Sequence, residues 1–191
     1  MCSKLCLGRI PGYLLFAMTL WFTWKWKCDR VFDSTFQLSL CPGSIFAGGV
    51  IRDNTMNWLV GFALNKGLGS VIEAELWGIF EGLKLVWKVG FRKVIVESDS
   101  QSTVLLLSNT IPLNHLLFNI IHVCKSLMEN EWSCTIHHVY RESNKAVDFL
   151  TNLSHYLDLE IIVFEEPPTQ ISGILDDDYN GVDVGRMISS S

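Results

Sequence analysis

The segment that decides the fold runs from Lys93 to Gln101 and reads KVIVESDSQ. Its β-branched run, Val94 to Val96, predicts a strand that is buried on both faces. The apolar pattern stops after this run, so Asp99 falls at the carboxyl end of the strand, where open α/β sheets bind ligands. In a second interpretation, Asp99 or Ser100 only caps the helix that follows. The other acids of the chain decide between the two.

Length and composition limit the kind of protein. The chain has 191 residues, 49% hydrophobic and 18% charged, which is enough for one domain with a sizeable core and extensions. The net charge of -5 argues against a broadly basic nucleic-acid binder, although it is compatible with a local basic groove or a carboxylate metal site. The six cysteines show no CxxC pair and no zinc spacing, so we expect buried thiols and an intracellular protein, nuclear or cytoplasmic.

The first 28 residues form an apolar lead segment with three open interpretations. Ile10 to Trp24 is apolar, but it is shorter than the roughly 20 residues that a membrane helix needs. We favour a poorly folded or lineage-specific extension that precedes the domain over a membrane-associating segment. A cleaved signal peptide is least favoured, because no small-residue cleavage site follows the apolar run.

Hydrophobic periodicity predicts a domain over residues 29–160. Three strands joined by short turns suggest an antiparallel meander, and Gly48-Gly49 in the second strand marks a bulge or a close backbone approach. Helices and strands alternate after the meander. The expected elements are strands at Arg30 to Leu38, Ile45 to Arg52, Trp58 to Leu64, Lys93 to Val96 and Ser133 to Val139, and helices at Ile72 to Gly90, Gln101 to Leu107, Leu116 to Met128 and Asn144 to Tyr156.

This order predicts an α/β fold in which a mixed five-stranded sheet carries flanking helices. Residues 161–191 are acidic and contain Pro167-Pro168, so we expect a tail that becomes disordered toward its end.

Four acids fall at positions that suggest chemistry. Asp33 lies within the first expected strand, Glu75 beside the apolar stripe of the first helix, and Asp148 near the start of the last helix, in addition to Asp99. Acids that converge on one strand end would repel one another unless a divalent cation neutralised them, and carboxylate oxygens suit Mg²⁺ or Mn²⁺. The alternatives are ordinary: Glu75 as a helix-start acid and Asp148 as a surface acid.

Four segments together resemble the ribonuclease H superfamily, in particular the reverse-transcriptase-like RNase H domains of plant genomes and their retroelements. The segments occur in the family's order and on the expected elements, and the resemblance runs from about Arg30 to Arg186. The matching segments are Gly48 to Asp53 (GGVIRD), Ala74 to Ile79 (AELWGI), Glu97 to Ser100 (ESDS) and His138 to Leu150 (HVYRESNKAVDFL).

The resemblance assigns a role to each candidate residue. It implies that Glu75, Asp99 and Asp148 bind metal, and that Asp33 is the first acid, although Ser34 follows it where the family usually has Gly. Asp29 is a less favoured substitute for Asp33. The other implied roles are proton transfer or product release for His138, contact with the hybrid's strands for Ser100 and Gln101, and bracing of the site for Asn144.

The resemblance thus implies an endonuclease that cleaves the RNA strand of RNA–DNA hybrids. Two Mg²⁺ or Mn²⁺ ions would activate a water and stabilise the leaving 3′ oxygen, with no small-molecule cofactor. The first rival is a decayed or domesticated retroelement module that binds nucleic acid without cutting it, and the altered first strand favours this rival. The second is a protein organised by a membrane-associated lead segment. The sequence leaves the oligomeric state open.

Overall fold

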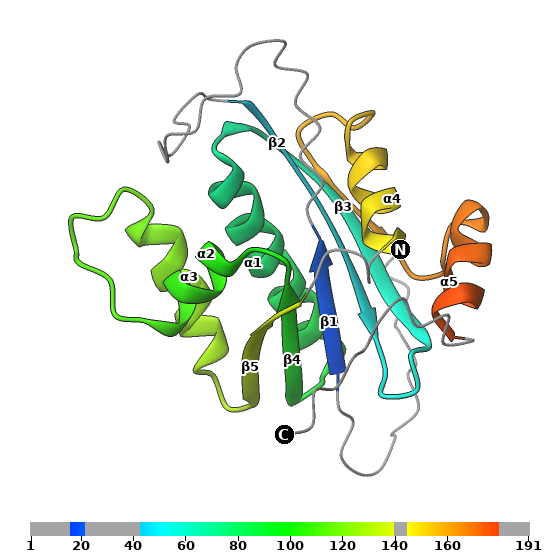
Figure 1. The fold of residues 1–191 in the computed structure, drawn as a ribbon, viewed down its shortest axis with the longest axis horizontal. Helices are drawn as coiled ribbons and strands as arrows, with labels where there is room; N and C mark the ends of the chain where they lie inside the picture. The colour runs from blue at the N-terminus through cyan, green and yellow to red at the C-terminus, as the bar shows by residue number, and fades with distance from the viewer. Residues whose placement is uncertain (1–15, 22–42, 140–144, 180–191) are drawn as a thin grey trace, which may run out of the picture.

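The computed structural model of the chain describes residues 16–21, 43–139 and 145–179, and it shows a mixed sheet with helices on both faces (Figure 1). In the described residues the sheet has six strands in the order β5-β4-β1-β2-β3-β6. β1, β4 and β5 are parallel to one another, whereas β2 is antiparallel to β1 and β3, and β6 is antiparallel to β3. The strands are β1 Phe16–Trp21, β2 Gly43–Arg52, β3 Trp58–Gly69, β4 Lys93–Ser98, β5 Ser133–His138 and β6 Ile161–Phe164.

The helices bury two separate apolar clusters against opposite faces of the sheet. On β2, Ile51 belongs to the larger cluster, with Leu76 of α1 and Ile121 of α3, whereas Val50 belongs to the smaller one, with Leu150 of α4. Successive residues of a strand point to opposite faces, so α1 and α4 lie on opposite sides. The helices are α1 Val71–Val89, α2 Gln101–Ser108, α3 Phe118–Met128, α4 Lys145–Ser154 and α5 Ser172–Tyr179.

α1 begins and ends where the sequence predicts. Ser70 caps its first turn: its hydroxyl accepts a hydrogen bond from the backbone N–H of Glu73, whose side chain accepts one from the Ser70 N–H. Gly90 ends the helix in the left-handed conformation with a φ of 99°, which glycine adopts at little cost. These caps fix the position of Glu75 in the second turn of the helix.

Gly48, the first glycine of the pair in β2, lies very close to the backbone of α4. A Cβ built on Gly48 would lie 2.7 Å from both the backbone nitrogen and the hydroxyl oxygen of Thr151 in α4. No side chain fits in that space, so glycine lets α4 pack directly on the strand. The register shifts of β2 fall elsewhere, between Ile45 and Phe46 and between Ile51 and Arg52. The close approach expected at this pair is confirmed.

The first strand differs from the expectation. The strand that lies between β4 and β2 is β1, Phe16–Trp21, which comes from the apolar lead segment. A six-residue segment that is apolar except for Thr19 suits a central strand with neighbours on both sides. The segment Arg30 to Leu38, where we expected this strand, lies outside the described residues. No helix in the described ranges is long and apolar enough to cross a membrane.

The segment after residue 160 also differs from the expected tail. β6 adds a sixth strand beside β3, and a 3-10 turn, η2 (Thr169–Ile171), leads into α5. Ile171 is fully buried in the smaller cluster with Val50, Ala146 and Leu150. The four-residue strand is too short to show a period of its own, and acidic residues surround it, which is why the sequence resembles a polar tail.

Replacing Ile171 by alanine tests whether this C-terminal segment is part of the folded domain. We expect Ile171→Ala to lower the free energy of unfolding by about 2–3 kcal/mol, because it leaves a cavity in the smaller cluster. Urea denaturation measures the change. Val163→Ala in β6 is the control, since Val163 is 41% exposed and its truncation should cost less than about 1 kcal/mol. Equal, small losses for both variants would show that the domain is complete without the segment.

Candidate functional site

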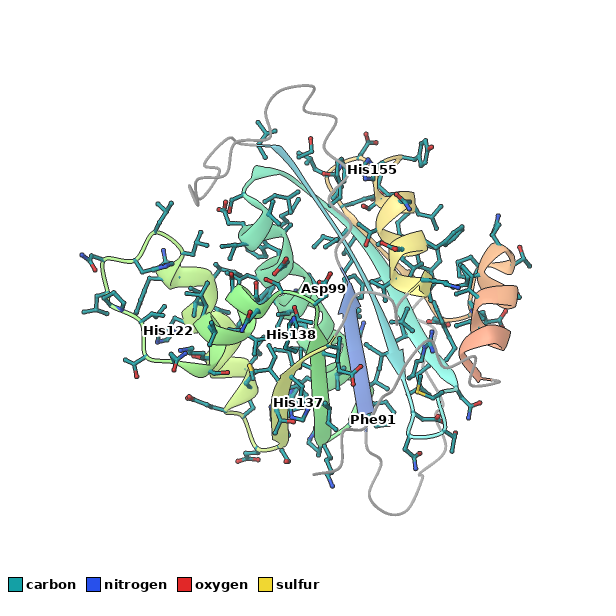
Figure 2. All side chains as sticks on the ribbon, viewed as in Figure 1. Phe91, Asp99, His122, His137, His138 and His155 are labelled. Atoms are coloured by element: carbon teal, nitrogen blue, oxygen red, sulfur yellow. The ribbon has the colours of Figure 1, made fainter. Side chains whose placement is uncertain are left out.

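Asp99 lies directly after β4, at the edge where three parallel strands end. Leu20 of β1 pairs with Ser98 of β4, and His138 of β5 pairs with Ser98 from the other side. The His138 Nε2 atom lies 3.2 Å from the backbone oxygen of Asp99, and the Val139 N–H donates to the Ser98 carbonyl at 3.0 Å. Figure 2 shows Asp99 and His138 next to each other at this edge. The end of β5 is thus joined to the end of β4 at Asp99.

The first turn of α2 connects Asp99 to α1. Ser100 is the N-cap of α2, and its hydroxyl accepts a hydrogen bond of 3.2 Å from the Thr103 N–H. The Thr103 hydroxyl donates to the Oε2 atom of Glu75, and the Ser100 side chain also forms a hydrogen bond with this carboxyl. Two hydroxyl groups therefore hold Glu75 against the turn that follows Asp99, close enough for the charge of Asp99 to act on the Glu75 carboxyl group.

Burial and charge both perturb Glu75. Its side chain is 6% exposed, and burial raises its pKa from 4.5 to about 7. Hydrogen bonds from Ser100 and Thr103 oppose this rise in the pKa, and the negative charge of Asp99 adds to it. A cation between the two carboxyl groups would relieve both the burial cost and the repulsion.

The pair fits a hard divalent cation. Mg²⁺ is usually bound through one or two carboxylates, with waters and substrate phosphates completing its shell. Glu75 and Asp99 supply two such groups. Within the described ranges, however, no three His, Cys, Asp or Glu side chains converge as a metal-binding group. Glu75 and Asp99 are therefore the two carboxylates that the contacts of the described residues bring together.

The remaining candidate acids are not part of this pair. Asp148 lies in the first turn of α4, half-buried, on the face of the sheet opposite α1, and no metal-binding group includes it. β1, which lies beside β4, contains no acid in its sequence FAMTLW. Asp33 and Asn144 lie outside the described residues. Their proposed roles, and that of Asp148 as a ligand, stay predictions.

The other predicted residues surround the pair. Gln101 is the first residue of α2 and is exposed, as is His138. Sequence reasoning missed Thr103, which is fully buried and contacts Glu75 directly. The available signal was a hydroxyl residue within an otherwise apolar stretch, TVLLL, four positions after Asp99.

The sheet order, the helices on both faces and the acids on α1 and after β4 define a ribonuclease H-like fold. RNase H1 of Halobacterium salinarum NRC-1 superposes with a TM-score of 0.58 at 18% identity, over 76% of this chain and 98% of that one. The N-terminal RNase H domain of a Mycobacterium tuberculosis protein gives a TM-score of 0.57 at 20% identity, over 74% and 94% of the two chains. LC11-RNase H1, solved in complex with an RNA/DNA hybrid, gives a TM-score of 0.55 at 17% identity, over 74% and 96%.

The chain belongs to the reverse transcriptase-like family, whose model matches residues 32–154. The match begins after β1 and one residue before Asp33. A protein of Arabidopsis thaliana named "Putative ribonuclease H protein" is 29% identical over 90% of this chain. This chain spans about a third of that relative's length, 36%. The resemblance to RNase H-like domains is confirmed at the level of family and fold.

Proposed function

We propose that this domain binds RNA–DNA hybrids and cleaves their RNA strand with the help of divalent metal ions. The observation that carries the proposal is the pair formed by Glu75 and Asp99, which the first turn of α2 holds together at the end of β4. The family supports it, and so does the fold shared with LC11-RNase H1, which has been solved with an RNA/DNA hybrid.

Different residues are proposed to bind the metal and to assist the reaction. Glu75 and Asp99 would hold Mg²⁺ or Mn²⁺, with Asp33 and Asp148 as the further proposed ligands. When bound, the metal would supply Lewis-acid stabilisation of the phosphate and a water of lowered pKa. His138 is exposed beside the backbone of Asp99, where it is proposed to assist proton transfer or product release.

Recognition of the substrate would come from residues next to the metal site. Gln101 is exposed at the start of α2, one residue from the N-cap Ser100, and both are proposed to contact the hybrid's strands. Asn144 is proposed to brace the site. Contacts to the 2′-hydroxyl would distinguish the RNA strand from the DNA strand.

A module that binds hybrids without cutting them is the second candidate. The observation that favours it is the sequence of β1, because the strand beside Asp99 has no carboxylate. For cutting, Asp33 would have to supply the missing carboxylate from the segment after β1. Ser34 follows Asp33 at the position where the resemblance implies Gly.

Metal removal tests the proposal. We expect the chain to cut a labelled RNA–DNA hybrid with Mg²⁺ or Mn²⁺ and to stop when EDTA is added, because EDTA removes the metal that Glu75 and Asp99 would hold. Gel analysis measures cutting, and fluorescence anisotropy measures binding of the same hybrid.

The variant Asp33→Asn tests whether Asp33 is the first metal ligand. Cutting that survives this change would place that ligand elsewhere. Binding without any cutting under either metal would favour the second candidate.

A further inference from the structure

Thr103 makes an unusual contact for a buried threonine on a helix. A helical threonine hydroxyl commonly bonds the carbonyl oxygen of its own preceding turn. The Thr103 hydroxyl instead reaches from α2 to α1 and donates to the Oε2 atom of Glu75. The residue is fully buried, and its backbone N–H donates to Ser100 within the same turn.

We infer that Thr103 is a positioning residue that orients the Glu75 carboxyl group for a divalent cation. The inference rests on the proposed function, because it concerns the same site. Glutamate has three rotatable side-chain bonds, and its terminal torsion has broad, roughly two-fold preferences. A buried donor on one oxygen restricts that torsion and fixes the plane of the carboxyl group. Hydrogen-bond partners of ligating carboxylates generally act in this way.

The position of Thr103 also links Glu75 to Asp99. Asp99 ends β4, Ser100 caps α2, and Thr103 lies in the first turn of that helix. The hydroxyl that holds Glu75 thus belongs to the turn that directly follows Asp99. The contact therefore fixes the position of the Glu75 carboxyl group relative to the turn that follows Asp99, and its loss would let the spacing of the pair vary.

Two variants separate the hydroxyl from the volume of the side chain. Thr103→Val keeps the shape and removes the donor, whereas Thr103→Ser keeps the donor and removes a methyl group. Mn²⁺ affinity, measured by electron paramagnetic resonance at pH 8, is expected to fall about 10- to 100-fold in Thr103→Val. It is expected to stay within about threefold of the unmodified chain in Thr103→Ser. An unchanged affinity in Thr103→Val, or equal losses in both variants, would overturn the inference.

A metal-free measurement checks the contact independently. In EDTA at pH 8, Thr103→Val is expected to lower the Tm by about 4 °C, because it removes a hydrogen bond to a buried carboxylate. In a Glu75→Met background the same change should lower the Tm by less than about 1 °C, since the hydroxyl has lost this acceptor. Equal shifts in both backgrounds would overturn the inference.

The outcomes for positioning and for the proposed function can be told apart. Loss of Mn²⁺ affinity in Thr103→Val, in a chain that does not cut hybrids, would support positioning and contradict the endonuclease. Hybrid cutting with unchanged Mn²⁺ affinity in Thr103→Val would contradict positioning alone. A chain that binds no Mn²⁺ at all would overturn both.

Discussion

Asp99→Asn is expected to lower the rate of hybrid cleavage by at least about 1,000-fold. A neutral amide cannot replace a carboxylate that neutralises a divalent cation, and metal-ion catalysis supplies several kcal/mol of transition-state stabilisation. The change keeps the size of the side chain, and the backbone oxygen of Asp99 remains available to His138. Single-turnover cleavage of a labelled hybrid, with the protein in excess, measures the chemical step.

The control for this prediction is a carboxylate outside the site. Glu129 is exposed at the end of α3, and Glu129→Gln should cut at the rate of the unmodified chain. Hybrid affinity of Asp99→Asn should be unchanged or higher, because a negative charge near the phosphates has been removed. A variant that cuts at the normal rate would exclude Asp99 as a metal ligand.

Glu75→Gln is expected to make the metal-free protein more stable at pH 8 but not at pH 4. The folded-state pKa of Glu75 is about 7, above the 4.5 of an unperturbed glutamate. The folded state therefore binds this proton more tightly than the unfolded state, and the stability contributed by protonated Glu75 is lost as the pH rises from about 4.5 to 7. Glutamine carries no such proton, so the variant should gain up to about 3 kcal/mol over the unmodified chain at pH 8.

Urea denaturation in EDTA at the two pH values measures this difference. Glu129→Gln is again the control, and its difference from the unmodified chain should be the same at both pH values. Millimolar Mg²⁺ at pH 8 should stabilise the unmodified chain more than Glu75→Gln, because a cation binds the ionised carboxyl group only in the folded state. A gain for Glu75→Gln that is equal at pH 4 and pH 8 would contradict the raised pKa.

Much of the fold could be predicted because its elements show clear periods. The β-branched run before Asp99 became a central strand, and the apolar stripe between Ser70 and Gly90 became α1. These signals are local, so one sequence is enough to detect them. Two strands could not be predicted. The segment that became β1 resembles a short membrane or signal segment, and β6 is too short for a pattern.

In the candidate site, too, local patterns predict some residues, whereas contacts between helices cannot be predicted from them. A strand end predicts Asp99, and helical spacing places Glu75 near the start of α1. The contact between Thr103 and Glu75 depends on how α2 packs on α1, which no local pattern encodes. The face of the sheet on which α4 packs is likewise a tertiary property, and the role of Asp148 as a ligand stays a prediction.

The place of β1 in the sheet has a consequence for how the chain folds. β1 is hydrogen-bonded to β4 on one side and to β2 on the other, so it joins the half of the sheet formed by β4 and β5 to the half formed by β2, β3 and β6. Neither half can separate without breaking a row of backbone hydrogen bonds. β1 precedes both of its partners in the chain, and its pairing with β4 joins residues that are far apart in sequence, such as Phe16 and Val94. The hydrogen bonds on the two sides of β1 therefore couple the two halves of the sheet, and we expect the long-range pairing of β1 with β4 to slow folding.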